Sequence, residues 1–261
     1  MSNSFQVAGK KLVAVLACRN KGSRLYGKPL QNLDIETGVT VLDNIVNCLK
    51  MIPVIDEVVL AIAEGNENQS FVDVAHGHGI RYVIGNEHDV LLRLVRGGQM
   101  AEATDVFRVT SESPFMHFEL VEQLWAGHVE GGYDCTFLDD AIDGCGFEIL
   151  SLNSLVISHE NGDSRHRSEM CTLYIREHAD QFKVIRHRPA ADLIRKDLRL
   201  TVDNPEDLVV CRNIYARFKD RAPRIPVTEI ISHLDEKPEL RALVAPFTEL
   251  GYSSMYVWKQ S

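Results

Sequence analysis

Short apolar runs of strand length alternate with segments of helical periodicity through the first hundred residues of this chain. The run "KLVAVLAC" (11–18) is apolar almost throughout, which is typical of a strand buried on both faces. In "TVLDNIVNCLKMI" (40–52) the apolar residues recur on one face of a helix. This alternation predicts an α/β fold in which a mostly parallel central sheet carries helices on both faces.

The same patterns continue, less regularly, in the second half of the chain. We expect the polar segment 160–167 to be exposed. We expect the aromatic tail, Tyr252, Tyr256 and Trp258, to pack in the core or between subunits. Strands are predicted at 11–18, 56–63, 80–85, 105–110, 133–139, 146–151, 182–187 and 198–203. Helices are predicted at 40–52, 66–79, 88–103, 151–159, 168–181, 204–218 and 226–235.

Length and charge limit the classes of function. The 261 residues carry 28 basic and 37 acidic side chains, a net charge of −9 that disfavours nucleic-acid and anionic-membrane partners. No apolar run approaches the roughly 18–20 residues of a membrane span, and the first run lacks a leader-peptide cleavage site.

The six cysteines form no C-x-x-C pair, so we expect isolated reduced thiols in a cytoplasmic protein. With no internal repeat, residues 1–261 are predicted to form a single domain.

The connection after the first strand is long and basic. It runs for about twenty residues where such loops usually have about two to six, and long loops in compact domains tend to be functional. Arginine pairs with phosphate oxygens in bidentate fashion, lysine acts as a movable charge, and glycine lets backbone amides approach an anion. The composition of this loop therefore predicts either a phosphate cradle or an ordinary solvated surface. The residues concerned are Arg19, Lys21, Gly22, Arg24, Gly27 and Lys28.

Two common phosphate-binding motifs do not describe this loop. The sequence "GSRLYGKP" (22–29) has Pro29 where a Walker loop needs a Ser or Thr hydroxyl for Mg²⁺. No G-x-G-x-x-G follows the first strand, which disfavours dinucleotide binding. In an open parallel sheet, ligands bind outside the carboxyl ends of the strands, where this loop lies.

The stretch "ACRNKGSRLYGKPL" (17–30) resembles the N-terminal signature of the cytidylyltransferases that make CMP-activated sugars. That family includes the CMP-Kdo and CMP-N-acetylneuraminate synthetases and SpsF-like proteins. Its signature runs roughly A-R-x-x-S-x-R-L-x-G-K-x-L; here Cys18 separates Ala17 from Arg19. Later segments match family motifs in the same order: "VIGNEHDVLLRL" (83–94), "FRVTSESP" (107–114), "GCGFEILSLNSL" (144–155) and "LRLTVDNPEDL" (198–208).

The resemblance implies a Rossmann-like, GT-A-type nucleotidyltransferase that uses CTP and Mg²⁺. It implies transfer of CMP to an acidic, nonulosonate-like sugar for surface polysaccharide, and a homodimer formed through an element within about 133–190. The triphosphate would be held by Arg19, Arg24 and Lys28, and the metal by Glu112 and Asp203. Other positions in the family motifs, expected to contribute to nucleotide binding, are Ala17, Gly22, Ser23, Asp89, Arg93, Arg108 and Glu148.

Departures from the family pattern leave alternatives open. Glu112 replaces a family aspartate, and Met170 replaces a family histidine in "RSEMCTLYI" (167–175). Asp203, which precedes Asn204-Pro205, has the competing role of a helix cap. The alternatives are CTP-dependent transfer to a phosphorylated or phosphonylated small molecule and a non-catalytic nucleotide-binding relative. A GT-A glycosyltransferase is disfavoured because "FLDDAID" (137–143) matches a D-x-D metal motif poorly.

Overall fold

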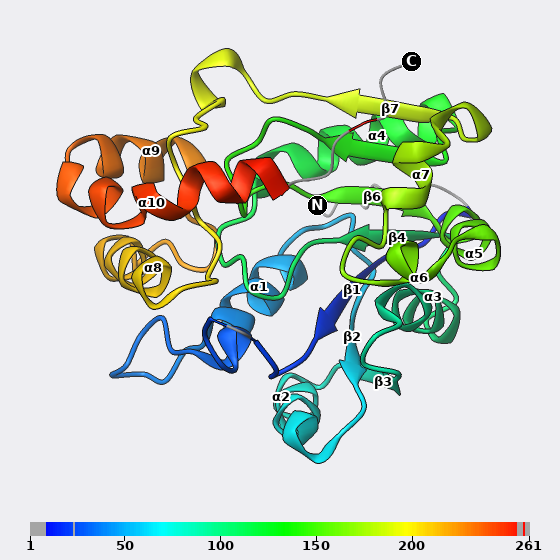
Figure 1. The fold of residues 1–261 in the computed structure, drawn as a ribbon, viewed down its shortest axis with the longest axis horizontal. Coiled ribbons are helices and arrows are strands. Elements are labelled where there is room, and N and C mark those ends of the chain that lie inside the picture. The colour runs from blue at the N-terminus through cyan, green and yellow to red at the C-terminus, as the bar shows by residue number, and fades with distance from the viewer. Residues whose placement is uncertain (1–8, 23, 255–257, 259–261) are drawn as a thin grey trace, which may run out of the picture.

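The structure, a computed structural model, describes residues 9–22, 24–254 and 258. These residues contain a seven-stranded sheet in the spatial order β3-β2-β1-β4-β6-β5-β7 (Figure 1). Its strands are β1 (Leu12–Cys18), β2 (Glu57–Ala63), β3 (Arg81–Gly85), β4 (Asp105–Arg108), β5 (Cys135–Leu138), β6 (Glu148–Ser151) and β7 (Val184–His187). The predicted α/β class with a mostly parallel sheet is confirmed.

Strand direction determines which residues meet at the edge of the sheet. Strands β1 to β4 pair in parallel, as do β5 and β7, whereas β6 runs antiparallel to both β4 and β5. The last residue of β4, Arg108, therefore lies opposite the first residue of β6, Glu148. Because of this reversal, β6 presents its amino end where the parallel strands present their carboxyl ends.

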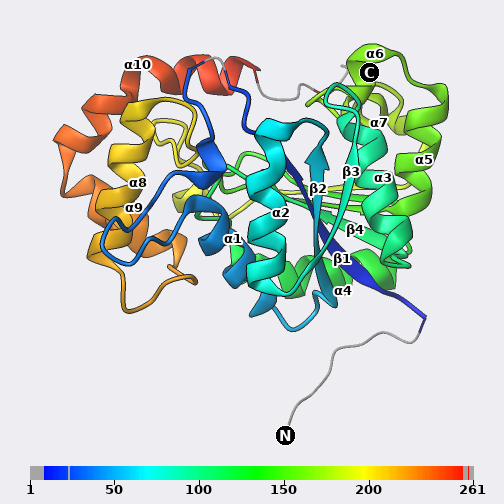
Figure 2. The ribbon, with the colours of Figure 1, turned by 90° about the horizontal axis from the view of Figure 1, so that it is seen from below.

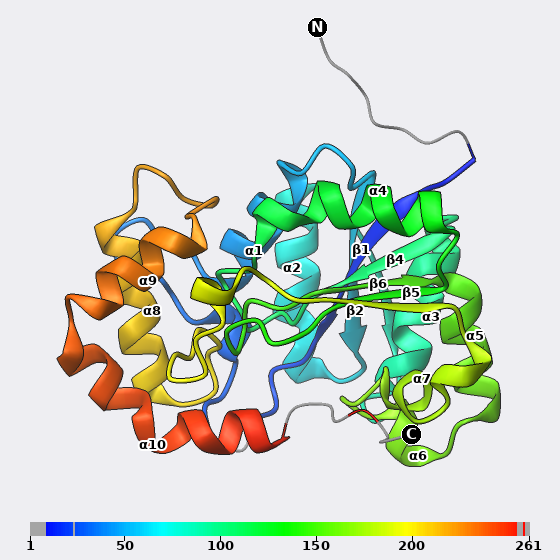
Figure 3. The same cartoon turned by 90° about the horizontal axis from the view of Figure 1, so that it is seen from above.

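Helices cover both faces of the sheet. Figure 2 shows α1 and α2 on one side of the strands and α3 and α5 on the other. Helices α8, α9 and α10 gather at one end of the molecule, and α5, α6 and α7 at the other (Figure 3). The helices are α1 (Val41–Lys50), α2 (Gln69–His78), α3 (Val90–Met100), α4 (Val121–Gly131), α5 (Leu152–Asn161), α6 (Ser164–Arg167), α7 (Leu173–Glu177), α8 (Pro205–Arg217), α9 (Val227–Asp235) and α10 (Pro238–Ser254).

Each face of the sheet has its own apolar core. Alternate residues of β1 point to opposite faces, so that Leu12, Ala14 and Leu16 join one cluster, and Val13 and Val15 join the other. Helix α1 completes the first cluster. This helix begins after Thr40, whose hydroxyl accepts a hydrogen bond from the amide of Asp43 while the Asp43 carboxylate accepts one from the amide of Thr40. The second is completed by α3 and α5.

Most of the predicted elements are present, with ends shifted by a few residues. The strand predicted at 198–203 is wrong: this segment makes one isolated bridge, between Asp143 and Arg199. Its alternating pattern arises because Leu198, Leu200 and Val202 are buried while the residues between them are polar. The helix predicted at 168–181 is shorter, and α4 and α10 were not predicted.

The predictions for the aromatic tail and for the polar segment 160–167 are confirmed in part. Trp258 packs edge-on against Phe137 and joins the second core cluster, whereas Tyr256 lies outside the described residues. Segment 160–167 is largely exposed, except for His166 in α6. All six cysteines are buried, and no disulfide joins any two of them. Within the described part of the chain, no helix combines the length and apolar character needed to cross a bilayer.

Candidate active site

The basic loop after β1 is held in place by its own backbone. Gly27 adopts a left-handed conformation (φ 58°), and its amide donates to the carbonyl of Asn20 at 2.8 Å. The amide of Asn20 donates to Oδ1 of Asn68, also at 2.8 Å, which ties the loop to the turn before α2. A Cβ on Gly22 would collide with the carbonyl of Leu25. The two glycines thus allow a tight, anchored loop rather than an open one.

All four cations of the loop face carboxylates from other segments. Lys28 Nζ lies 2.6 Å from Oδ1 of Asp203, and Arg24 reaches the same oxygen at 3.2 Å. Arg19 pairs with Glu169. Lys21 is exposed and lies 3.5 Å from the Glu87 carboxylate. Arg24 and Lys28 therefore converge on one carboxylate, whereas Arg19 and Lys21 turn to other partners.

A cavity of about 190 Å³ lies between this loop, the end of β1 and the segment after β4. Most of the residues predicted to bind the nucleotide line it. Val109 and Thr110 follow β4 and form the opposite wall. The predicted site residues in its lining are Ala17, Arg19, Gly22, Arg24, Lys28, Arg93, Arg108 and Glu112.

Glu112 and Asp203, the predicted metal ligands, come from segments joined by a backbone hydrogen bond. The amide of Val202 donates to the carbonyl of Glu112 at 2.9 Å. Burial raises the pKa of Glu112; the Lys28 charge opposes this rise and the Asp203 charge adds to it. Burial also acts to raise the pKa of Asp203, but the ion pairs with Lys28, Arg199 and Arg24 hold it below its usual value.

These two carboxylates suit Mg²⁺ in their chemistry. Both are hard oxygen ligands, and the Asp203 charge adds to the rise in the pKa of Glu112 that burial causes, a repulsion of the kind that a bound cation relieves. Among the described residues no group of three or more His, Cys, Asp or Glu side chains is arranged to hold a metal. Mg²⁺ usually completes its shell with substrate phosphates and water, so two protein carboxylates are enough for such a site.

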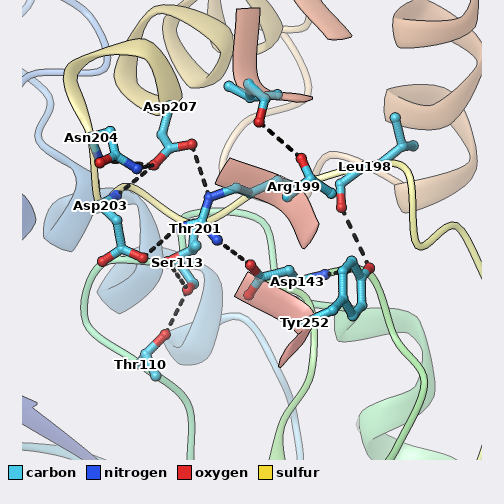
Figure 4. Close-up of polar contacts among 12 residues, drawn as sticks. Thr110, Ser113, Asp143, Leu198, Arg199, Thr201, Asp203, Asn204, Asp207 and Tyr252 are labelled. Carbon is cyan, nitrogen blue, oxygen red and sulfur yellow. Dashed lines mark hydrogen bonds and ion pairs between the residues drawn. The ribbon is translucent and has the colours of Figure 1, made fainter. Parts of the chain in front are cut away.

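Asp203 does not act as the helix cap. The cap of α8 is built by Asn204 and Asp207, because the Asp207 carboxylate accepts hydrogen bonds from the amides of Asn204 at 2.8 Å and Asp203 at 3.0 Å. The carboxylate of Asp203 instead faces Lys28 and Arg24. It also pairs with the side chain of Arg199 (Figure 4). The competing reading of Asp203 as a cap is therefore wrong.

Arg108 and Glu148 meet because β4 and β6 run in opposite directions. Arg108 Nη1 lies 2.8 Å from Glu148, whose other oxygen accepts from Arg176 at 3.0 Å and from the Thr172 hydroxyl at 3.1 Å. Burial acts to raise the pKa of Glu148, yet Arg108 and Arg176 hold it below its usual value. Glu148 is thus a buried, ionised anchor for two arginines.

Two further predicted site residues, Arg93 in the lining of the smaller cavity and Asp89 outside both linings, have partners within the fold. Arg93 is buried and donates to the carbonyls of Ala61 at 2.6 Å and Cys18 at 3.2 Å, so it joins the ends of β1 and β2 beneath the loop. Asp89 caps α3 through the amide of Leu92 and pairs with His159 at 2.9 Å. Ser23 lies outside the described residues. The ligand-binding roles of all three stay predictions.

A larger cavity of about 500 Å³ adjoins the first. The two share a wall formed by Arg108, Val109, Thr110, Glu112 and Glu169. Asp139 lies on the far side, where it pairs with Arg186 at 2.5 Å and accepts from the Trp258 indole at 2.8 Å. Residues here that the sequence reasoning did not assign to the site include Arg176, Arg186, Asp139, Tyr252 and Trp258.

The α/β fold, with two adjoining cavities at the edge of its sheet and a basic loop beside one of them, has the architecture that the resemblance to nucleotidyltransferases predicts. The model of the cytidylyltransferase family matches residues 13–243, and the chain therefore belongs to that family, whose members are nucleotidyltransferases. It is 27% identical over 236 residues to the spore coat polysaccharide biosynthesis protein SpsF of Bacillus subtilis (strain 168), covering 89% of this chain and 87% of that protein.

Solved structures share the fold at low sequence identity. A cytidylyltransferase from Leptospira borgpetersenii serovar Hardjo-bovis superposes with a TM-score of 0.80 at 18% identity, covering 88% of this chain and 96% of that one. A CMP:2-keto-3-deoxy-manno-octonic acid synthetase complexed with CTP gives 0.58 at 15% identity, covering 80% and 99%. These structures confirm the predicted fold, and the family model confirms the predicted family and the nucleotidyltransferase class.

Proposed function

We propose that this protein transfers CMP from CTP to a hydroxyl group of an acidic, nonulosonate-like sugar, for surface polysaccharide or glycoconjugate synthesis, and releases pyrophosphate. The observation that carries the proposal is the pair of adjoining cavities with a shared wall at Arg108 and Glu112. The smaller cavity borders the basic loop and suits a triphosphate; the larger suits an acceptor. Similarity to SpsF, named for spore coat polysaccharide biosynthesis, supports this acceptor class.

In this proposal, the protein works through position and charge. An acceptor oxygen attacks the α-phosphorus of CTP, the bond to the β-phosphate oxygen breaks, and pyrophosphate leaves. Arg19, Arg24 and Lys28 hold the phosphates and stabilise the charge that develops on the leaving group. Glu112 and Asp203 would hold Mg²⁺, which when bound would neutralise phosphate charge. The shared wall would keep the acceptor beside the α-phosphate.

The function is tested in two measurements on the full chain. Thermal-shift titration with CTP, UTP, ATP and GTP in the presence of Mg²⁺ should show the largest stabilisation by CTP, because stabilisation rises with ligand concentration over Kd. Pyrophosphate release is then measured with CTP and a panel of acidic sugars, with phosphorylated or phosphonylated small molecules as the second panel. No preference for CTP would refute the cytidylyl assignment. Release only with the second panel would refute the sugar acceptor, and no release at all would indicate a non-catalytic binding protein.

We also propose a homodimer formed through residues 133–190 of the single domain. This region contains β7, which lies at an edge of the sheet and is only partly buried. An edge strand offers free backbone groups to a second copy. Light scattering coupled to size-exclusion chromatography should give twice the 29.4 kDa chain mass, and a monomer mass at micromolar concentration would contradict the proposal.

A further inference from the structure

Arg199 is a buried arginine with a carboxylate on each nitrogen of its guanidinium. Nε donates to Asp207 at 3.0 Å, Nη1 pairs with Asp143 and Nη2 pairs with Asp203 (Figure 4). Its side chain is only 2% exposed. One positive charge is thus shared among three carboxylates, which requires the planar, forked donor set that arginine has and lysine lacks.

The three carboxylates serve different parts of the site. Asp207 closes the cap of α8, Asp143 lines the larger cavity, and Asp203 faces Lys28 and Arg24 of the basic loop. Arg199 takes one oxygen of Asp203, Oδ2, while Lys28 and Arg24 contact the other, Oδ1. Arg199 therefore fixes the orientation of the Asp203 carboxylate through Oδ2, the oxygen that Lys28 and Arg24 do not contact.

The C-terminal helix α10 packs directly on this group of charges. A Cβ added to Gly251 would collide with Nη1 of Arg199 and would lie 2.5 Å from the Asp143 carboxylate. The next residue, Tyr252, accepts a hydrogen bond from the amide of Asp143 and donates to the carbonyl of Arg195, both at 3.1 Å. Because glycine occupies position 251, the helix approaches closely enough to enclose the arginine.

We propose that Arg199 is a positioning residue for Asp203. It fixes the carboxylate so that Oδ1 stays directed at Lys28 and Arg24 of the basic loop, and α10 keeps Arg199 in place through Gly251. The inference rests on the proposed function, because it concerns the metal that the bound nucleotide would share with Asp203. Arg199 itself lines neither cavity, so its effect on ligand binding passes through the carboxylates that it holds, Asp203 among them.

The test compares Arg199→Lys with Arg195→Lys. Arg195 is a matched control on the same segment: it pairs with Asp197 and Asp235, both at 2.7 Å, outside both cavities. Binding of Mn²⁺ to the protein–CTP complex is measured by electron paramagnetic resonance, and binding of CTP without metal by calorimetry. Residues that orient a metal ligand typically account for about 10–100-fold in metal affinity. We expect Arg199→Lys to weaken Mn²⁺ binding about tenfold or more, to change metal-free CTP affinity less than about threefold, and Arg195→Lys to change neither.

A second variant tests the same role in case Arg199→Lys does not fold. Gly251→Ala retains Arg199, but the added Cβ would collide with Nη1 of that arginine. Gly127→Ala in α4 is the control, because a Cβ there meets nothing within 4 Å. With folding checked by thermal unfolding, Gly251→Ala should weaken Mn²⁺ binding in the same direction, by about threefold or more, and Gly127→Ala should not. Wild-type Mn²⁺ affinity in folded Gly251→Ala or Arg199→Lys would overturn the positioning role. Failure of the wild-type protein to bind CTP would instead refute the proposed function.

Discussion

Replacing Glu148 with glutamine should destabilise the fold strongly, although the two side chains have nearly the same shape. Glu148 is 6% exposed and neutralises Arg108 at 2.8 Å and Arg176 at 3.0 Å. A glutamine leaves both guanidinium groups without that charge. Removing one partner of a buried ion pair costs about 3–5 kcal/mol.

The magnitude should fall at the lower end of that range. Arg108 has a side chain 16% exposed and can recover some hydration, and Arg176 retains Asp139 at 3.5 Å. We expect a loss of about 3 kcal/mol in the free energy of unfolding. For a chain of this size, about 2–4 °C in Tm accompanies each kcal/mol, which gives a decrease of about 6–12 °C.

Urea unfolding followed by circular dichroism measures this loss directly, and the slope m should stay unchanged if only stability is affected. Glu239→Gln is the control: its side chain is 65% exposed and lies 3.8 Å from Lys237, so its free energy of unfolding should change by no more than about 0.5 kcal/mol. A loss below about 1 kcal/mol in Glu148→Gln would refute the view that this carboxylate is ionised and needed by both arginines.

Three further changes test other parts of the structure. Lys28→Ala should weaken CTP binding by about 2 kcal/mol or more, some thirtyfold, whereas Lys21→Ala, whose ammonium is exposed, should have little effect; calorimetry that shows equal affinity in both would remove Lys28 from the site. Burial opposes ionisation of Asp105, but His128, Thr104 and Lys10 hold its pKa below the usual 3.8, so its stabilising effect is present above about pH 4 and is lost as the pH falls through the lowered pKa. Asp105→Asn should flatten the loss of unfolding free energy below pH 4, and an unchanged slope would contradict this role. Thr40→Ala should cost about 1 kcal/mol through the cap of α1, with CTP affinity unchanged.

The sequence predicted the sheet well where local pattern and burial agree. The continuous apolar run of β1 and the one-sided periodicity of α1 each report directly on where those residues are buried. The segment at 198–203 misled the same reasoning, because alternation of buried Leu198 and Leu200 with Arg199 and Thr201 looks like a strand. Arg199 binds carboxylates and Thr201 accepts a hydrogen bond from the Ser113 hydroxyl, so both are buried rather than facing solvent, and no local pattern distinguishes these two cases.

The site was predicted by motif order but not by contacts. Motif positions as far apart as Lys28 and Asp203 meet in the structure, which supports the order of motifs as a guide. Arg176 and Trp258 were missed because neither is itself a motif position, yet both line the larger cavity and pack on the ring of Phe137 in β5. Contacts of this kind join segments that are distant in the sequence, and a single sequence does not show them.

The pairing of the loop cations explains how a basic cluster is held in an acidic protein. Arg24 and Lys28 share Asp203, and Arg19 pairs with Glu169, so two carboxylates partly offset these three positive charges. In the proposed function, a triphosphate would compete with these carboxylates for the three cations, which would lower its net gain in binding. Release of Asp203 from Lys28 at that moment would free an oxygen for a metal ion accompanying the nucleotide. In the proposed positioning role, Arg199 would hold the released Asp203 carboxylate in its orientation, so nucleotide binding would also prepare the metal ligand.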